Sequence, residues 1–303
     1  MFDVIIIGAG PTGLTAAIYA TRRMMKTLVI SKDIGGQIIW TSEIENYPGI
    51  KLIKGTNLVT DIYEQAKSLG AKIRIAEVSQ IIRQDDGNFV IQANQEKYES
   101  KTVIIAMGLM PKVLSLPNER EFVGRGISYC ANCDAPLFKG KTVAVIGGGN
   151  AALDAAEVLS KIARNVYLVY HKSKFKGFEI LIDEVKNKEN VKVILESDII
   201  EISGKQKLEK IKVVNHTDQT MRWLEVDGLF VEIGHQPKTD LVADLVERDG
   251  KGQIIVDLCC RTSLEGMFAA GDVTQIEFKQ IVIGCGQGAV AALSAYKYLQ
   301  GKK

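Results

Sequence analysis

The chain has 303 residues, of which 46% are hydrophobic and 24% charged, and its formal net charge is +2. This composition is ordinary for a globular protein, and the length suits two domains. The lysines and arginines are dispersed, which excludes a concentrated basic surface for nucleic acid, so we expect no nucleic-acid partner.

Two apolar stretches have to be weighed as export or membrane segments. The N-terminal run as far as Ala9 contains Asp3 and has no basic region before it, which argues against an export signal. Residues 281–299 contain three glycines and Lys297, so we expect a buried helix there rather than a membrane span. We therefore expect a cytoplasmic protein with no membrane partner.

The first nucleotide-binding signature opens the chain. Residues 2–7, FDVIII, predict a buried parallel strand, and Gly8, Gly10 and Gly13 follow it in the pattern GxGxxG. In such a loop the first glycine makes a tight turn, the second lets the backbone approach a pyrophosphate, and the third lets the next helix pack closely. A helix over residues 11–21 would then present its free amide groups to phosphate.

The same arrangement recurs in the second half of the chain. Residues 142–146, TVAVI, predict a strand that leads into Gly147, Gly149 and Ala152, with Asn150 at the start of a helix. We expect that helix to end near residue 163. Two strand, loop and helix units of this form predict two dinucleotide sites.

Each half continues in the same way. Turn formers at residues 85–88 and 217–219 lie between strand-like segments, and apolar strands over residues 102–106 and 228–233 each lead to a glycine. The internal repeat predicts two domains of the same kind, each a nucleotide-binding sheet with an antiparallel meander.

A dithiol motif lies between the two glycine signatures. Cys130 and Cys133 form a CxxC sequence, and Asp134 follows directly. Five cysteines are an odd number and give no framework of structural disulfides, which leaves redox or metal chemistry for the pair. A structural zinc site is the alternative, but it needs four ligands, and the chain offers no second CxxC. We expect a redox-active dithiol.

The other cysteines are expected to have lesser roles. Cys259 and Cys260 are adjacent in the strand-like segment IIVDLCC, where neighbouring side chains point to opposite faces, so we expect them to be packing residues. Cys285 is close to a predicted helix start, which leaves a reactive thiol as the less favoured interpretation.

A third cluster lies near the C-terminus. The short apolar strand in MFAAGDV, residues 267–273, ends at Gly271 and Asp272. This places a carboxylate where it can accept hydrogen bonds from ribityl hydroxyls, with a following helix start directed at phosphate.

Through these motifs the chain resembles the low-molecular-weight thioredoxin reductases of bacteria and archaea over its whole length. The matching segments are GAGPTG (8–13), GGQ (35–37), ENYPG (45–49), SYCANCD (128–134), GGGNAA (147–152), GHQP (234–237), and AAGDV with Lys279-Gln280 (269–280).

The resemblance implies an α/β fold of two Rossmann-like FAD- and NAD(P)-binding domains with three-layer ββα architecture. The FAD domain would be discontinuous, residues 1–114 and 243–303, with the NAD(P)H domain, residues 115–242, inserted into it and carrying the dithiol. The family is homodimeric, and its two domains rotate about the crossings near residues 112–121 and 236–245.

The resemblance also implies the FAD contacts residue by residue. The pyrophosphate would face Gly8, Gly10 and Gly13. The flavin would lie along Gly36, Gln37 and Asn46. The ribityl-phosphate region would be held by Gly271 and Asp272, and Gln280 would approach the isoalloxazine.

For the dithiol, the resemblance implies that Cys133 faces the flavin, that Cys130 attacks the disulfide of thioredoxin or a thioredoxin-like protein, and that Asp134 moves protons during the exchange. Electrons would pass from a nicotinamide nucleotide through FAD and the dithiol to that partner.

One segment departs from the family. After the strand over residues 166–169, members that use NADPH usually carry His-Arg-Arg and a later arginine, where this chain has Tyr170, His171, Lys172 and Lys176. Lysine binds phosphate as a point charge, without the fork of arginine. No acidic residue ends the strand to favour NADH.

We therefore expect NADPH as the donor, held by Gly147, Gly149, Asn150, Ala152, His171, Lys172 and Lys176. Reduction by NADH, ferredoxin or a deazaflavin remains an alternative. A nucleotide-responsive redox sensor or binding module without turnover is the alternative of another class.

Overall fold

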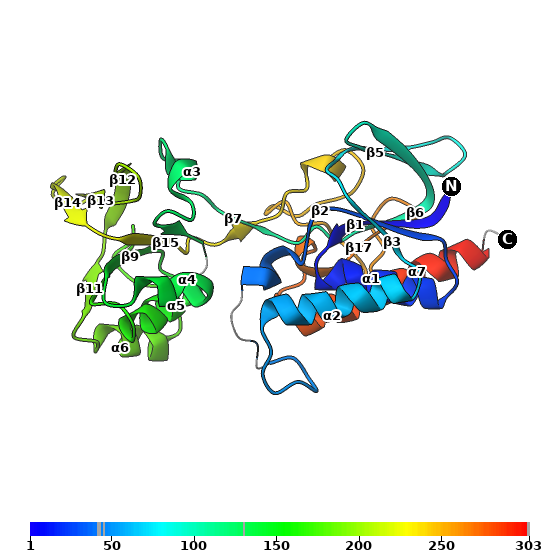
Figure 1. Ribbon diagram of the computed structural model, residues 1–303. Coiled ribbons are helices and arrows are strands. Elements are labelled where there is room, and N and C mark those ends of the chain that lie inside the picture. The colour runs from blue at the N-terminus through cyan, green and yellow to red at the C-terminus, as the bar shows by residue number, and fades with distance from the viewer. Residues whose placement is uncertain (41–43, 45, 130, 302–303) are drawn as a thin grey trace. The chain divides into compact units, whose positions relative to one another are not determined.

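The computed structural model describes residues 1–40, 44, 46–129 and 131–301, in which the chain divides into two units (Figure 1). Unit 1 comprises Met1–Met110 and Gln236–Lys303, and unit 2 comprises Pro111–His235. At the two crossings the strands β7 (Met110–Pro111) and β16 (His235–Gln236) pair with each other.

A mixed sheet forms the centre of unit 1. Its order is β3 (Lys72–Ile75), β2 (Thr27–Ile34), β1 (Phe2–Ala9), β6 (Glu96–Ile105), β5 (Phe89–Ala93) and β4 (Val78–Arg83), and β17 (Met267–Ala269) also pairs with β6. Pairs among β3, β2, β1, β6 and β17 are parallel, and the β4–β5–β6 meander is antiparallel.

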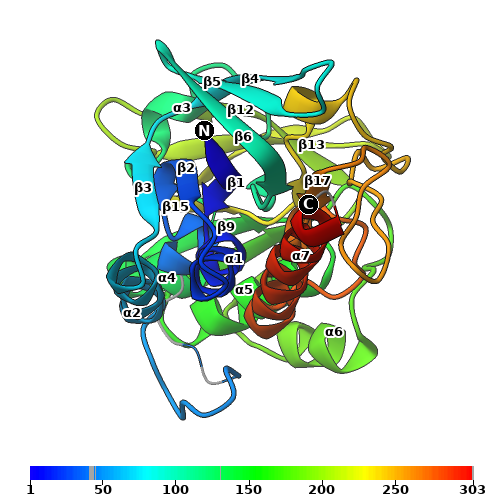
Figure 2. The same ribbon diagram turned by 90° about the vertical axis from the view of Figure 1, so that its right-hand side faces the viewer.

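Both faces of this sheet are covered, which explains the unbroken apolar run in β1. Val4 and Ile6 belong to the core on the helix side, whereas Ile5 and Ile7 belong to the core on the opposite face. The helices are α1 (Pro11–Arg22), α2 (Gly55–Ser68) and α7 (Ile281–Gly301), with 3-10 turns η1 (Gly36–Trp40), η3 (Asp240–Val242) and η4 (Gly271–Val273). Figure 2 shows α1 and α7 side by side.

Unit 2 repeats the plan on a smaller scale. Its parallel sheet has the order β11 (Val191–Ile194), β10 (Asn165–Val169), β9 (Thr142–Ile146), β15 (Gly228–Val231) and β8 (Ile127–Ser128). A separate antiparallel meander consists of β12 (Ser197–Ser203), β13 (Lys210–Asn215) and β14 (Met221–Glu225). The helical elements are α3 (Glu119–Phe122), α4 (Ala131–Asp134), η2 (Ala135–Phe138), α5 (Asn150–Ser160) and α6 (Glu179–Lys186).

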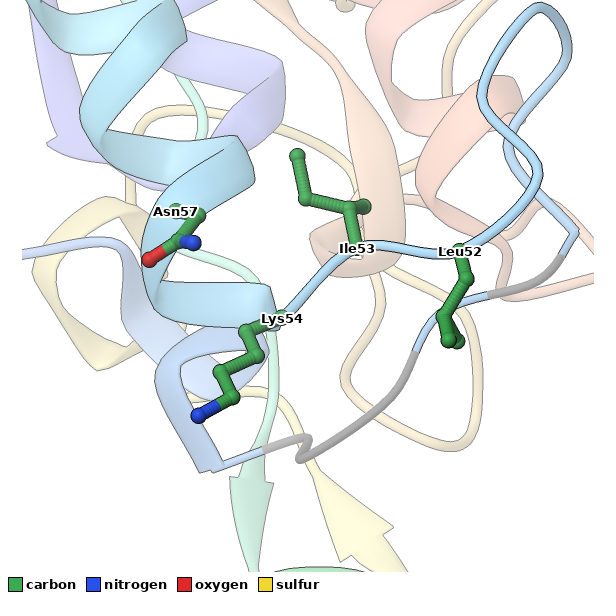
Figure 3. Close-up of a pocket in the computed structure, with 4 residues that line it drawn as sticks. All are labelled: Leu52, Ile53, Lys54 and Asn57. Atoms are coloured by element: carbon green, nitrogen blue, oxygen red, sulfur yellow. The ribbon is translucent and has the colours of Figure 1, made fainter.

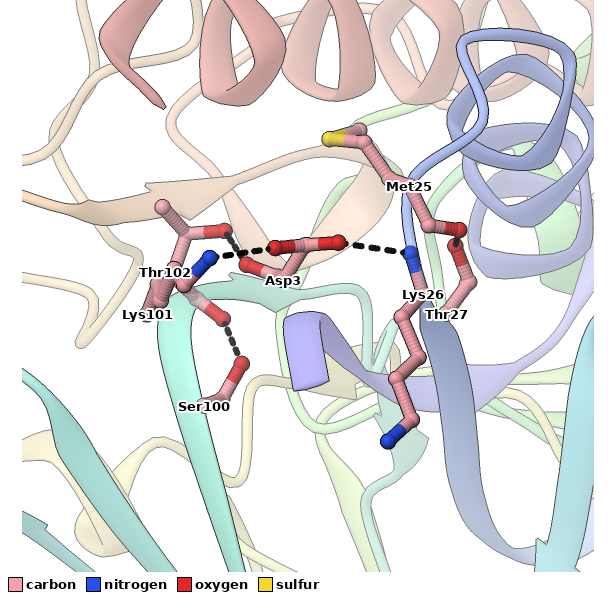
Figure 4. A network of polar contacts seen from close by, with 7 residues as sticks. All are labelled: Asp3, Met25, Lys26, Thr27, Ser100, Lys101 and Thr102. Carbon is pink, nitrogen blue, oxygen red and sulfur yellow. Dashed lines mark hydrogen bonds and ion pairs between the residues drawn. The ribbon is translucent and has the colours of Figure 1, made fainter. Parts of the chain in front are cut away.

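The first strand of unit 1 is fastened at its start by Asp3 (Figure 4). One carboxylate oxygen accepts the backbone N–H of Lys26 at 2.8 Å, and the other binds the ammonium of Lys101 at 2.8 Å. The hydroxyl of Thr102 donates to the Asp3 carbonyl at 2.7 Å. Asp3 thereby ties β1 to both of its neighbours, β2 and β6.

The predicted α/β class is confirmed, with two corrections in detail. Helix α5 ends at Ser160 rather than near residue 163. The segment before Cys260 is a turn rather than a strand, because the Asp257 carboxylate accepts the N–H groups of Cys259 and Arg261 at 2.9 Å each. Cys260 is buried with a left-handed φ of 58°, and Cys259 is partly exposed.

Candidate functional site

The first glycine loop combines two packing glycines with one open position. A Cβ at Gly8, whose φ is 112°, would lie 2.3 Å from the Ala106 carbonyl oxygen. A Cβ at Gly13 would lie 1.9 Å from the Gly8 carbonyl oxygen. At Gly10 the nearest atom to such a Cβ would be the Gly35 carbonyl oxygen, 3.8 Å away. The loop therefore leaves backbone free for a ligand at its middle glycine.

Thr12 lies where the first glycine loop, the Gly271 turn and helix α7 meet, and we call the surface that these three segments form the cradle. The sequence analysis did not identify Thr12. A Cβ at Gly271 or at Gly284 would lie 2.5 Å from the Thr12 hydroxyl oxygen, and one at Gly288 would lie 2.2 Å from the Thr12 carbonyl oxygen. The glycines four apart at 284 and 288, a small-residue spacing that permits close helix contact, are the signal that α7 lies tightly against α1.

The GGQ and ENYPG segments meet the same cradle. A Cβ at Gly36 would lie 3.8 Å from the Gly10 Cα, so these two backbones approach each other. The side-chain amide of Gln37 donates to the Leu109 carbonyl at 3.1 Å. The amide of Asn46 donates to Oε1 of Gln280 at 3.1 Å, although 234 positions separate the two in sequence.

The Gly-Asp turn is held by side chains on both sides. Oε1 of Gln287 accepts the Gly271 N–H at 2.8 Å, and the Lys279 ammonium donates to the carbonyls of Asp272 and Thr274 at 3.1 and 2.7 Å. Burial raises the pKa of Asp272, and the charge of Lys279 acts in the opposite direction. Burial likewise lowers the pKa of Lys279.

All nine residues predicted to contact FAD lie in unit 1, where Gly36 approaches Gly10 and the Gly271 turn abuts Thr12. The arrangement fits a dinucleotide, because the middle glycine of the loop is open, α1 begins beside it, and the Asp272 carboxylate lies on the Gly271 turn that abuts Thr12. Main-chain N–H groups at a helix start suit a pyrophosphate, and a carboxylate suits ribityl hydroxyls.

The second glycine loop follows the same plan, with packed glycines before an open one. A Cβ at Gly147 would lie 2.2 Å from the Glu232 carbonyl oxygen and 2.8 Å from the Cβ of Ala152, and one at Gly148 would lie 2.4 Å from the ring of Tyr170. Gly149 has open space around it. Oδ1 of Asn150 accepts the N–H of Phe178 at 2.8 Å, so Asn150 holds the 175–178 segment as well as starting α5.

The predicted phosphate-binding residues gather beside this loop. The Lys176 N–H donates to the Gly148 carbonyl at 2.7 Å. The buried ring of Tyr170 stacks on Phe175 with centroids 5.7 Å apart, and His171 packs against its edge. Hydrogen bonding and charge from Lys176 lower the pKa of Lys172, so the two ammonium groups are neighbours. Two adjacent exposed cations next to an open glycine suit an anionic group.

The dithiol is only partly within the described structure. Cys130 and the side chain of Cys133 lie outside the described residues, while Asp134 ends the short helix α4 and is partly buried. The residue before Cys130 is anchored: the Tyr129 hydroxyl donates to Oε1 of Glu119 at 2.6 Å. Burial, followed by the hydrogen bond to Glu119 and its charge, raises the pKa of Tyr129.

Glu119 itself is a residue that sequence reasoning missed. Its side chain is buried, and besides Tyr129 its carboxylate accepts the N–H groups of Leu114 and Leu116 at 2.9 and 3.3 Å. It therefore joins the chain entering unit 2 to the segment that carries the dithiol. No local pattern in the sequence marks it.

Other features of the structure are less directly related to the predicted sites. A hollow of about 380 Å³ at the start of α2 is lined by Leu52, Ile53, Lys54 and Asn57 (Figure 3), none of which is a predicted site residue. Within the described ranges, no three His, Cys, Asp or Glu side chains gather as metal ligands would. The helices described there include none with the length and apolarity needed to cross a membrane.

The remaining cysteines are shielded to different degrees. Burial raises the pKa of Cys260 to about 12, which keeps it a thiol. Cys285 is 8% exposed in the first turns of α7, and the Tyr47 hydroxyl donates to its sulfur at 3.9 Å. Burial, followed by the charge of Cys285 and the hydrogen bond to it, raises the pKa of Tyr47 to about 12.

Known proteins are similar to this chain along its length. A family model for pyridine nucleotide-disulphide oxidoreductase matches residues 2–288. Thioredoxin reductase of Borreliella burgdorferi is 38% identical over 302 residues, 98% of this chain and 92% of that protein. The crystal structure of Lactococcus lactis thioredoxin reductase in the FR conformation has a TM-score of 0.87 at 36% identity and covers 99% of this chain and 100% of that one.

A longer relative is the bifunctional thioredoxin reductase/thioredoxin of Mycobacterium leprae. It is 37% identical over 300 residues, 98% of this chain but 66% of that protein, so this chain spans just under two thirds of it. The comparisons confirm the predicted class, a flavoprotein disulfide oxidoreductase with FAD and a nicotinamide nucleotide as cofactors. The chain belongs to the pyridine nucleotide-disulphide oxidoreductase family.

Proposed function

We propose that this protein is a thioredoxin reductase that takes electrons from NADPH and delivers them, through FAD and the Cys130–Cys133 dithiol, to the disulfide of thioredoxin or a thioredoxin-like protein. The observation that carries the proposal is the cradle in unit 1, where the backbone of Gly10 and Gly36 is open and the Gly271 turn packs against Thr12. Unit 2 contains a second open glycine, Gly149, and its sequence includes the CxxC motif.

In this proposal unit 1 is the FAD domain and unit 2 the NADPH domain, and the molecule works as a homodimer in the cytoplasm. FAD, when bound, supplies two-electron transfer from the nicotinamide to the disulfide. The glycine loop and the start of α1 would hold its pyrophosphate, Asp272 would orient the ribityl chain, and the hydrogen-bonded pair Asn46 and Gln280 would contribute to binding the flavin.

The dithiol then carries out an exchange that balances in sulfur and protons. The Cys130 thiolate attacks one sulfur of the partner disulfide, forming a mixed disulfide and releasing a partner thiolate. Cys133 attacks the Cys130 sulfur, which releases the second partner thiolate and leaves the Cys130–Cys133 disulfide. Two protons move from the enzyme thiols to the partner, and Asp134 transfers them.

The test is steady-state oxidation of NADPH by the purified holoprotein with oxidised thioredoxin, alongside parallel assays with NADH, reduced ferredoxin and a reduced deazaflavin. We expect turnover with NADPH and thioredoxin. Turnover with ferredoxin or deazaflavin alone would replace the donor in the proposal. Flavin reduction without turnover of any disulfide would favour a redox sensor.

A further inference from the structure

Tyr129, the residue directly before Cys130, lies between a strand and a helix of unit 2. β8 ends at Ser128, which pairs with Phe230 of β15, and α4 begins at Ala131. Tyr129 and Cys130 are the two residues between these elements. Tyr129 is therefore the link between the sheet of unit 2 and the first cysteine of the CxxC motif.

The side chain of Tyr129 is held at both its ring and its hydroxyl. The half-buried ring packs against the core cluster that includes Ile127 and Leu229. The hydroxyl donates to Oε1 of Glu119 at 2.6 Å. Because burial, the hydrogen bond to Glu119 and the charge of Glu119 all raise the pKa of Tyr129, the hydroxyl stays a donor through the neutral range.

The acceptor of this bond is itself fixed. The Glu119 side chain is buried, and besides the Tyr129 hydroxyl its carboxylate accepts the N–H groups of Leu114 at 2.9 Å and Leu116 at 3.3 Å. Leu114 and Leu116 pack against the same core cluster as Tyr129. A carboxylate tied to backbone in this way cannot follow the tyrosine, so its position sets where the hydroxyl lies.

The residue after Cys130 is held by a longer bond. The Ala131 N–H donates to Oε1 of Glu232 at 3.4 Å. Burial raises the pKa of Glu232 to about 7, the Ala131 N–H lowers it, and the charge of Asp154 raises it. Because short hydrogen bonds to carboxylates are the strong ones, the bond on the Tyr129 side is the firmer of the two.

We propose that Glu119 and Tyr129 are positioning residues for the dithiol: they hold the residue before Cys130 at a fixed place in unit 2 and so favour closure of the Cys130–Cys133 disulfide. In the disulfide form the S–S bond itself restricts Cys130. Fixing Tyr129 therefore removes conformational freedom chiefly from the dithiol form, which raises the effective concentration of one sulfur toward the other. The inference rests on the proposed function, which makes this pair reversibly oxidised.

The test is the equilibrium of the FAD-loaded protein with a glutathione redox buffer, without oxygen, NADPH or thioredoxin. Oxidised glutathione takes two electrons from the dithiol through a mixed disulfide. Two enzyme S–H bonds and the glutathione S–S bond are replaced by the enzyme S–S bond and two glutathione S–H bonds. Acid quenching, alkylation and peptide mass spectrometry then give the fraction of closed disulfide.

Two single variants and their combination measure the contribution of the bond. Tyr129→Phe keeps the ring and removes the hydroxyl, and we expect its equilibrium constant for closure to fall roughly 3- to 10-fold, the effect of one hydrogen bond. Glu119→Gln weakens the same bond and should shift closure in the same direction. The double variant should fall by less than the product of the two single effects. If Glu119→Gln does not fold, Tyr129→Phe decides alone.

Two controls separate positioning from stability. Tyr167→Phe makes the same chemical change on a half-buried tyrosine that packs against the same core cluster, and it should match the wild type. Asn190→Ala removes hydrogen bonds to the carbonyls of Ser160 and Ala163, so it should destabilise unit 2 and leave disulfide closure unchanged. A wild-type equilibrium in Tyr129→Phe overturns the proposal, as does an equal shift in Asn190→Ala.

The glutathione equilibrium involves neither the nucleotide donor nor the protein partner. If Tyr129→Phe shifts closure as expected while the wild type does not reduce thioredoxin, the proposed function fails and the positioning role stands. If thioredoxin is reduced but closure is the same in Tyr129→Phe, the reverse holds.

Discussion

Lys172 and Lys176 present neighbouring ammonium groups on the exposed segment after β10, and Lys176 lowers the pKa of Lys172 by hydrogen bonding and by its charge. The electrostatic repulsion between the two ammonium groups decreases when an anion contacts both of them. The 2′-phosphate of NADPH is such an anion, and NADH lacks it.

We expect NADPH to be preferred over NADH by roughly 5- to 150-fold in kcat/KM, less than a forked arginine site would give. The double substitution of Lys172 and Lys176 by alanine should remove most of this preference and leave NADH use nearly unchanged. Lys174→Ala, an exposed lysine between them, is the control. Steady-state kinetics with both nucleotides decides, and an unaltered preference in the double variant would contradict the assignment.

The glycine loop of unit 1 predicts opposite outcomes at two positions. The wild type should bind about one FAD per chain. Gly10→Val should fold but bind little FAD, because its side chain enters open space, whereas Gly13→Ala should fail to fold, because its Cβ would meet the Gly8 carbonyl oxygen at 1.9 Å. Flavin absorbance and thermal unfolding measure the two effects. A yellow, fully loaded Gly10→Val protein would argue against the cradle.

The two cysteines of the CxxC sequence should be separable by spectroscopy. Both Cys130→Ser and Cys133→Ser should abolish thioredoxin reduction while retaining NADPH-dependent reduction of ferricyanide, which needs no dithiol. From the family resemblance, Cys130→Ser should show a long-wavelength charge-transfer band and Cys133→Ser should not. Cys259→Ser is the control and should keep full turnover. A band only in Cys133→Ser would reverse the assignment of the two sulfurs.

The raised pKa of Glu232 predicts that the stability of the protein depends on pH. Its folded-state pKa of about 7 lies above the ordinary value of 4.5, so the folded protein binds the proton more tightly. The free energy of unfolding should therefore fall as pH rises from about 4.5 through 7, by up to about 3 kcal/mol. Glu232→Gln should lack this loss. Urea unfolding at pH 5 and pH 8 measures the change in the free energy of unfolding between the two pH values. An equal change in the wild type and in Glu232→Gln would disprove the prediction.

Glu119 should be a stability determinant of unit 2. Glu119→Ala leaves two backbone N–H groups and the Tyr129 hydroxyl without their acceptor, and we expect a loss of about 2–4 kcal/mol in the free energy of unfolding. Tyr129→Phe removes one of the three bonds and should cost about 1 kcal/mol. Glu121→Ala, exposed on the same short helix, is the control. A near-neutral Glu119→Ala would refute the anchoring role.

The parts of the fold that the sequence predicted correctly are those set by local geometry. Val4 and Ile5 are buried on opposite faces of the sheet, which requires an unbroken apolar strand. The positive φ of Gly8 and the close approach at Gly13 require glycine, so both features are visible in the sequence. A repeat of these local requirements in the second half predicted the second unit.

The parts that the sequence did not predict depend on long-range contacts or on a competing local interaction. Glu119 reaches Tyr129, and Glu232 reaches Ala131, through pairings that no spacing encodes. The apolar segment before Cys260 suggested a strand, but the Asp257 carboxylate captured the following N–H groups and formed a turn. Thr12 looked like an ordinary helix residue until the tertiary fold brought Gly271 and Gly284 to it.

The fastening of Asp3 has a practical consequence for handling the protein. Its bonds to Lys26 and Lys101 hold the first residues at the end of the sheet where β1 begins. The Gly8 loop lies at the opposite end, where that strand finishes. An affinity tag or fluorophore attached before Met1 should therefore emerge one strand length away from the flavin cradle. Fusions at this terminus should leave flavin loading intact.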